Sequence, residues 1–320
     1  MDALYNAAKP RVVAIGGPTA TGKTALSVAL AKRFGGEIIS ADSMQIYQGL
    51  DVGTAKVTPE EMQGVPHHLV GFLAPEQAFS VADFTTLAGK TITQLTAQGK
   101  LPLVVGGTGL YITSLLNGIG FTPEKVDPAI RQELQARLQA EGSQALYAEL
   151  AAVDPGYAAK VHPNNTPRVI RALELYRATG RKMSAEREAA RPAEKPFRSL
   201  CLCLTCRDRT LLYQRIDTRC DRMMQSGILE EAKLVYDHRD TYRTAAQAIG
   251  YKEAVAAVRG EAAPQDAVAA IQLASRRYAK RQLTWLRRDA DLFWLRHEKT
   301  PDMDRACRLS TQFLSSRGIE

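Results

Sequence analysis

The segment from Gly17 to Thr24 places the strongest constraint on how this chain folds, because it reads Gly-Pro-Thr-Ala-Thr-Gly-Lys-Thr. This spacing matches the G-x-x-x-x-G-K-[ST] phosphate loop. Residues 11–16 before it are predicted to form a buried strand, and residues 25–33 after it a helix. In such a unit, backbone N–H groups and the helix N-terminus surround phosphate oxygens. The sequence therefore predicts a site that holds a diphosphate or a triphosphate.

Every residue of this loop is a predicted contact of the phosphates. The predicted diphosphate-binding residues of the loop are Gly17, Pro18, Thr19, Ala20, Thr21, Gly22, Lys23 and Thr24. The Lys23 ammonium is expected to reach terminal phosphate oxygens, and the Thr24 hydroxyl is the expected ligand of a Mg²⁺ cofactor.

Strand and helix patterns alternate along the first hundred residues. Residues 37–40 and 101–106 are predicted to be further strands. This alternation predicts an α/β fold with a P-loop-containing parallel sheet core flanked by helices. Ligands of such folds lie at the carboxyl ends of the strands. The phosphate loop, Asp42 and Thr108 all follow strand ends, so we expect them to converge on one site.

The pattern changes between residues 118 and 195, where only helices are predicted. The expected helices there span residues 127–141, 143–153 and 167–179, and a polar loop is expected at residues 187–196. A strand is expected again at residues 199–205, followed by helices at 209–225, 229–238 and 264–288. We therefore predict a catalytic core of residues 1–117 and 196–320 with C-terminal helices, interrupted by an all-helical insertion domain at residues 118–195.

The composition is typical of a globular protein, with 45% hydrophobic and 24% charged residues. No apolar run is long enough for a transmembrane helix, and residues 1–10 lack the apolar segment of a signal peptide. A cytoplasmic location without membrane association and a monomeric state are the default expectations. The net charge of +8 favours polyanionic partners.

Two groups of residues raise the alternative of a metal centre. Cys203 and Cys206 form a C-x-x-C pair, but no second pair lies nearby, so we interpret them as buried strand residues. His67 and His68 are adjacent, and adjacent residues rarely present both rings to one ion. A structural role is favoured for them as well.

Asp42 follows the second predicted strand and begins the polar segment Asp42-Ser43-Met44-Gln45. An aspartate at this position is compatible with three roles, namely a Mg²⁺ ligand, a general base or a helix N-cap. The residue types alone leave these alternatives open.

Longer segments resemble one family. They are GPTATGKT at 17–24, ADSMQIYQGLDVGTAK at 41–56, PHHL at 66–69, FSVADF at 79–84, LVVGGTGLY at 103–111, HPNNTPRVIRALE at 162–174, RIDTRCDRM at 215–223, AIGYKE at 248–253 and RYAKRQLTW at 277–285. In this order the chain resembles the bacterial type of tRNA dimethylallyltransferase (tRNA isopentenyltransferase). Val57 and Gly71 depart from the usual residues of that family.

The resemblance implies a reaction. The dimethylallyl group of dimethylallyl diphosphate moves to the N6 amine of the adenosine 3′ of the anticodon in tRNA, diphosphate leaves, and no ATP is hydrolysed. Asp42 matches the general base of the family, Thr108 matches a hydroxyl near the reaction centre, and Arg219 matches an arginine that binds the diphosphate.

The resemblance also implies contacts with the anticodon loop. The expected tRNA-binding residues are Asp42, Ser43, Met44, Gln45 and Thr108 around a flipped-out base, and Pro167, Arg168, Val169, Ile170 and Arg171 in the insertion. For Arg171 the alternative is a solvated helix start in which it pairs with Glu174.

A basic stripe on the last long helix also suits RNA phosphates, the alternative being a buried aromatic face with exposed charges. The stripe comprises Arg276, Arg277, Lys280, Arg281, Arg287 and Arg288, with Tyr278 and Trp285 interleaved.

Three other functions share parts of this pattern. A small-molecule kinase would use ATP through the same loop but would need neither the insertion nor the basic helix. An adenylate prenyltransferase would share the donor site, with less use for an RNA-binding insertion. An RNA-binding regulator would have no need of intact Lys23, Thr24 and Asp42.

Overall fold

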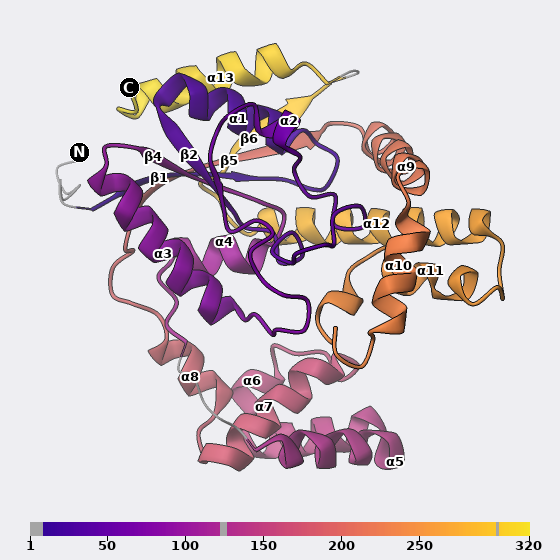
Figure 1. Cartoon of the computed structure of the whole chain (residues 1–320). Helices are drawn as coiled ribbons and strands as arrows, with labels where there is room; N and C mark the ends of the chain where they lie inside the picture. Colours follow the sequence, from indigo (N-terminus) through magenta and orange to yellow (C-terminus); the bar gives the residue numbers. More distant parts are fainter. Residues whose placement is uncertain (1–8, 122–126, 299–300) are drawn as a thin grey trace. The chain divides into compact units, whose positions relative to one another are not determined.

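The computed structural model describes residues 9–121, 127–298 and 301–320 and divides into two compact units (Figure 1). One unit comprises Met1–Leu116 and Pro196–Glu320, and we call it the sheet unit. The other, Asn117–Lys195, is the helical unit. The predicted insertion, residues 118–195, falls within the helical unit. Its binding of tRNA stays a prediction.

The sheet unit is built on one sheet whose paired strands are all parallel, which confirms the predicted fold class. The strands are β1 (Arg11–Gly16), β2 (Gly36–Ser40), β3 (His67–His68), β4 (Leu101–Val105), β5 (Arg198–Cys206) and β6 (Phe293–His297). Their order across the sheet is β3-β2-β4-β1-β5-β6. Because β1 lies between β4 and β5, the phosphate loop that follows it emerges near the middle of the sheet.

Helices complete the sheet unit. They are α1 (Lys23–Phe34), α2 (Pro59–Met62), α3 (Val81–Ala97), α4 (Gly109–Leu116), α9 (Arg209–Gln225), α10 (Ile228–Asp237), α11 (Tyr251–Val258), α12 (Pro264–Leu286) and α13 (Met303–Ser316), with a 3₁₀ turn at Ala245–Gln247. Among the described residues, no helix combines the length and the apolar character needed to cross a membrane.

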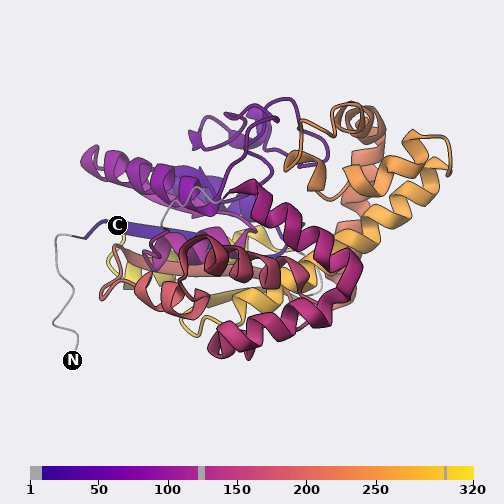
Figure 2. The same cartoon turned by 90° about the horizontal axis from the view of Figure 1, so that it is seen from below.

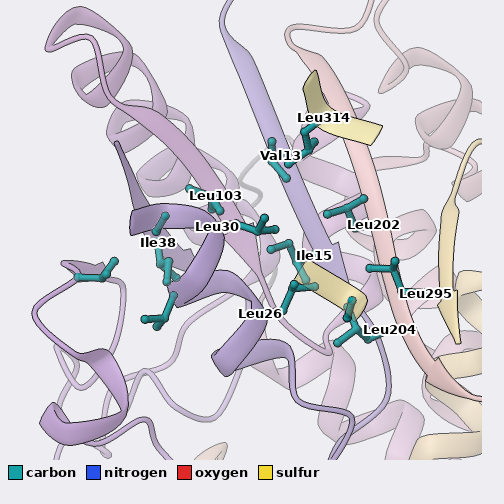
Figure 3. Packing of buried hydrophobic residues seen from close by; sticks show 14 of the residues in the cluster. Val13, Ile15, Leu26, Leu30, Ile38, Leu103, Leu202, Leu204, Leu295 and Leu314 are labelled. Atoms are coloured by element: carbon teal, nitrogen blue, oxygen red, sulfur yellow. The ribbon is translucent and has the colours of Figure 1, made fainter. Parts of the chain in front are cut away.

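Strand β1 is buried on both faces, as the apolar run in its sequence predicts. Its alternate side chains point to opposite faces of the sheet. Val13 and Ile15 pack with α1 and α13, where Leu26, Leu30 and Leu314 are fully buried (Figure 3). Val12 and Ala14 belong instead to the cluster formed with α3 and α4. The sheet is therefore covered on both sides, and its functional groups gather at the strand ends.

The helical unit contains α5 (Pro128–Val153), α6 (Pro155–Ala158), α7 (Thr166–Thr179) and α8 (Met183–Ala189). Helix α5, drawn in magenta, is bent along its length (Figure 2). The kink is at Gly142, whose φ of 82° and ψ of 173° are not helical. Glycine adopts a positive φ without a Cβ clash. The two helices predicted at 127–141 and 143–153 correspond to the two halves of α5.

Two expectations about the later part of the chain were wrong in detail. Arg187–Ala189 end α8, so only the second part of the loop predicted at 187–196 is irregular. Helix α12 ends at Leu286, so Arg287 and Arg288 follow it rather than extend its basic face. Strand β6 and helix α13 were not predicted, because β6 is short and mixes aromatic and basic residues without a clear alternation.

Candidate functional site

The carboxyl ends of the central strands border a cavity of about 1110 Å³. Its lining comes from the phosphate loop, from Asp42–Gln45 after β2, from residues 51–58, and from α9 and α12. All of these segments belong to the sheet unit.

The phosphate loop is held in shape by its own residues. The Thr21 hydroxyl and the Lys23 ammonium each donate a hydrogen bond to the Pro18 carbonyl, both at 2.9 Å. Gly22, with a φ of 95°, caps α1 in a left-handed conformation that favours glycine. Ala20 also has a positive φ, 65°, although it carries a Cβ. Backbone strain of this kind is typical of ligand-binding loops.

Two partly buried cations lie at the loop. The Arg219 Nη1 atom donates to the Thr19 hydroxyl at 2.7 Å, and burial lowers the pKa of Arg219. Burial, followed by the positive charge of Arg219, lowers the pKa of Lys23 to about 8. Within the described ranges, neither cation forms an ion pair with a carboxylate, and both bind neutral oxygens. Two partly desolvated like charges that lie near Asp42 but form no ion pair with it favour the binding of an anion between them.

The predicted group at the end of β2 is assembled as expected. The Asp42 Oδ1 atom accepts the backbone N–H groups of Met44 at 2.9 Å and Gln45 at 3.3 Å. The Thr108 hydroxyl oxygen accepts the N–H of Ser43 at 3.2 Å and donates to the Ser43 hydroxyl at 3.4 Å. Of the three roles considered for Asp42, the structure therefore shows that of capping a turn. The roles of general base and metal ligand stay predictions.

Further polar groups of this site are Gln45 and Tyr278. The Gln45 amide nitrogen donates to the carbonyls of Ala55 at 2.9 Å and Thr54 at 3.4 Å. Burial, and then the negative charge of Asp42, raise the pKa of the Tyr278 hydroxyl to about 12. Sequence reasoning treated Tyr278 only as an aromatic side chain in a basic helix, whereas it lines the cavity beside Asp42.

The arginine segment of the helical unit has a different character. Pro167 and Arg168 are exposed, whereas Val169 and Ile170 are buried in the core of that unit. The RNA contacts predicted for this segment stay a prediction, and the side chains exposed for them are those of Pro167, Arg168 and Arg171. Arg171 makes the alternative contact, because its Nη1 atom lies 2.8 Å from a Glu174 oxygen.

The metal alternatives at cysteine and histidine are not supported. Cys203 and Cys206 are buried in β5. The His67 Nδ1 atom lies 2.8 Å from the Val65 carbonyl, and His68 Nε2 lies 2.8 Å from Glu37. Among the residues that the structure describes, no cluster of three or more His, Cys, Asp and Glu side chains is arranged to hold a metal.

A magnesium ion nevertheless fits the donor set at the phosphate loop. Mg²⁺ prefers oxygen ligands and is commonly bound by one or two protein oxygens together with substrate phosphates and water. Thr24 lines the cavity at the start of α1, and its hydroxyl is the protein oxygen that would hold the ion.

The fold and this cavity define a P-loop protein that binds a phosphorylated ligand beside an aspartate–threonine pair. The family model described as IPP transferase matches residues 45–289, and the one described as isopentenyl transferase matches residues 10–70. The chain belongs to the IPP transferase family, which confirms the resemblance noted in the sequence.

Similar proteins cover nearly the whole chain. The tRNA dimethylallyltransferase of Bacillus subtilis is 48% identical over 299 residues, which are 93% of this chain and 94% of that relative. The crystal structure of the tRNA isopentenylpyrophosphate transferase from Bacillus halodurans matches with a TM-score of 0.71 and 44% identity, over 96% of each chain. A eukaryotic dimethylallyltransferase acting on tRNA matches with a TM-score of 0.79 and 30% identity, over 96% of this chain and 80% of that one.

Proposed function

We propose that this chain transfers the dimethylallyl group from dimethylallyl diphosphate to the exocyclic N6 amine of the adenosine 3′ of the anticodon in tRNA. Diphosphate is released and N6-(dimethylallyl)adenosine is formed. The names of the relatives support the reaction class. The observation in this chain that carries the proposal is the pair of partly buried cations, Lys23 and Arg219, beside Asp42 and Thr108.

The donor half of the reaction requires stabilisation of the leaving group. As the bond between the dimethylallyl carbon and the diphosphate oxygen breaks, negative charge grows on the diphosphate. The backbone N–H groups of the phosphate loop, Lys23 and Arg219 are fixed before the reaction, so they stabilise this charge without reorganising. The buried setting strengthens each of these interactions.

The acceptor half requires a base, because the adenine amine is a weak nucleophile. Its nitrogen forms the new bond to the dimethylallyl carbon, and one of its protons passes to the Asp42 carboxylate. The N–H groups of Met44 and Gln45 hold Oδ1 of that carboxylate. This leaves Oδ2 to accept the proton, and the Ser43–Thr108 contacts fix the adjacent backbone.

The acceptor base has to leave the anticodon stack to reach this cavity, as in other enzymes that modify a base. We propose that Ser43, Met44 and Gln45 contact the flipped adenine. Exposed Pro167, Arg168 and Arg171 of the helical unit are proposed to contact the anticodon loop. The basic residues of α12 were also predicted to contact RNA phosphates. Arg276 is a weaker candidate for such a contact, because it forms an ion pair with Asp217 at 2.7 Å.

We propose that the divalent metal of this reaction is Mg²⁺, held by the Thr24 hydroxyl and by oxygens of the diphosphate. When bound, the ion neutralises part of the charge of the leaving group. We also propose that the enzyme acts as a monomer in the cytoplasm, which light scattering and cell fractionation would test.

A transfer assay tests the proposed function. It contains labelled dimethylallyl diphosphate, unmodified tRNA, AMP and Mg²⁺ but no ATP. Label in tRNA is expected. Label in AMP alone would indicate an adenylate prenyltransferase, and ATP turnover without any transfer would indicate a kinase.

The variant Asp42→Asn tests the base. The amide keeps an oxygen for the N–H groups of Met44 and Gln45, so the loop retains its shape while the proton acceptor is lost. Transfer is expected to fall by about 10²–10⁴-fold with tRNA affinity retained. A variant as active as the wild type would remove Asp42 from the chemistry.

A further inference from the structure

Gln282 on α12 connects two loops that are far apart in the sequence. Its side chain is only 7% exposed. The Oε1 atom accepts the backbone N–H of Thr19 at 3.1 Å, and the Nε2 atom donates to the Gly107 carbonyl at 3.0 Å. Because an N–H group only donates and a carbonyl only accepts, one orientation of the amide satisfies both bonds. The contact is therefore a specific bridge.

The two bridged loops are the donor side and the acceptor side of the proposed site. Thr19 belongs to the phosphate loop, and its hydroxyl accepts the hydrogen bond of Arg219 at 2.7 Å. Gly107 directly precedes Thr108, whose hydroxyl oxygen accepts the N–H of Ser43. The bridge of Gln282 thus runs from the anion-binding loop to the loop that carries Thr108, which in turn contacts Ser43 beside the proposed base Asp42.

The glycine at position 107 is itself explained by the bridge. A Cβ atom placed on Gly107 would lie 2.2 Å from the Gln282 Nε2 atom, closer than any real contact. A larger residue would push the amide away from both loops. The turn therefore carries a glycine here because a buried side chain approaches its backbone.

Tyr278 lies beside the bridge on the same helix. It lies one turn before Gln282 and on the same face, because residues four apart are neighbours on a helix. Both Tyr278 and Gln282 line the cavity, and the negative charge of Asp42 acts on the Tyr278 hydroxyl. The face of α12 that borders the cavity therefore presents two adjacent polar side chains to the site.

We propose that Gln282 is a positioning residue that sets the separation between the phosphate loop and the Asp42–Thr108 loops. This inference rests on the proposed function. Holding the two loops together aims the acceptor amine at the dimethylallyl carbon, and a displacement of about 1 Å can cost about 10²-fold in rate. Without the amide, the Thr19 N–H and the Gly107 carbonyl lose their buried partners, so the loops separate to reach water.

Steady-state kinetics of the full-length enzyme test this role. Gln282→Leu removes both hydrogen bonds and keeps a similar volume. Its kcat is expected to fall about 100-fold, whereas the KM for dimethylallyl diphosphate stays within about threefold, because Lys23, Arg219 and the loop N–H groups remain. The ratio of diphosphate released to dimethylallyl transferred is expected to rise, since water competes better with a misplaced amine.

A matched control lies on the same helix. The Gln272 amide donates to Asp221 at 3.0 Å on the protein surface, away from both loops. Gln272→Leu is expected to leave kcat and both KM values within twofold. If Gln282→Leu does not fold, Gln282→Met provides the same test, because methionine fills irregular space with a flexible chain.

Each other outcome has a definite meaning. A wild-type kcat in folded Gln282→Leu would overturn the proposal, even if the melting temperature fell. A raised KM for dimethylallyl diphosphate with an unchanged kcat would make Gln282 a binding residue instead and would also overturn it. A wild-type enzyme that transfers no label would refute the proposed function rather than this inference.

Discussion

The charged groups at the phosphate loop of the sheet unit and around Glu174 of the helical unit differ in whether they have partners of opposite charge. At the phosphate loop, Lys23 and Arg219 are partly buried and donate hydrogen bonds only to neutral oxygens among the described residues. In the helical unit, one buried carboxylate, that of Glu174, accepts hydrogen bonds from Arg131 and Arg171 at 2.8–2.9 Å. The two cations at the phosphate loop are available to an anion, whereas Arg131 and Arg171 of the helical unit are paired with Glu174.

The acids of the two units differ as well. Burial works to raise the pKa of Glu174, but the hydrogen bonds and charges of Arg131 and Arg171 lower it overall. Glu231 on α10 instead accepts backbone N–H groups of the cavity loop at Asp51, Val52 and Gly53, together with the Tyr251 hydroxyl. A carboxylate in the helical unit joins helices through arginines, whereas this one shapes a loop of the site.

Within this comparison of the two units, the largest expected effect is that of replacing Arg219 rather than Arg171. Arg219→Leu removes a preformed cation from the leaving group, so kcat/KM for dimethylallyl diphosphate is expected to fall by about 10²–10³-fold. Arg171→Leu is the matched variant, and it is expected to leave donor kinetics unchanged. Steady-state assays at saturating tRNA measure both, and equal losses would break the comparison.

The second prediction concerns Glu231. Glu231→Ala leaves three loop N–H groups and the Tyr251 hydroxyl without their acceptor. The free energy of unfolding is expected to fall by about 1–3 kcal/mol. Glu230→Ala, at the exposed neighbouring position, is expected to change it by less than about 0.5 kcal/mol. Urea unfolding of both variants measures the difference, and similar losses would show that the loop does not depend on Glu231.

The third prediction is a pH dependence of donor binding. Burial and Arg219 lower the pKa of Lys23 to about 8 in the free enzyme, so the cation is lost as the pH rises through this value. A bound diphosphate favours the charged form and raises this pKa again. The affinity for dimethylallyl diphosphate is therefore expected to fall by up to about tenfold per pH unit above pH 8.

Calorimetric titration between pH 7 and pH 9.5 measures this effect. Lys23→Arg supplies the control, because a guanidinium stays protonated throughout this range. The variant is expected to bind with a flatter profile. A wild-type profile as flat as that of the variant would contradict a neutral Lys23 at high pH.

The smallest expected effect lies in the helical unit. Charge reversal at Arg168 and Arg171 is expected to raise the KM for tRNA about fivefold, or about 1 kcal/mol, because exposed ionic contacts are weak. The KM for the donor should stay constant. Arg259→Glu, an exposed change in the sheet unit, is the control. A change in the donor KM instead would place the RNA contacts of these arginines in doubt.

The parts of the molecule that were predictable from sequence are those with a local signal. The phosphate loop lies between a strand and a helix with clear periodicity, and Asp42 and Thr108 follow neighbouring parallel strands, so their meeting follows from the fold class. The residue roles proposed for them rest on resemblance and still await the assays.

The residues that sequence reasoning missed act over long separations. Gln282 is bound to Thr19 and Gly107, and Glu231 is bound to residues 51–53. Nothing next to either residue in the sequence signals these partners. The surroundings of Gln282 read as a basic helix, and those of Glu231 as an ordinary amphipathic one. Only the tertiary structure shows which polar side chains turn inward.

The place of the helical unit between α4 and β5 has a consequence for the order of folding. Strand β1 pairs with β5 in the register Arg11 with Arg198. One edge of β1 can therefore form its hydrogen bonds only after β5, far along the chain, has been synthesised. Closing so long a loop costs chain entropy. The helical unit is rich in local contacts, which form quickly. Its early collapse would shorten the effective loop, so that the insertion helps to complete the sheet that it interrupts.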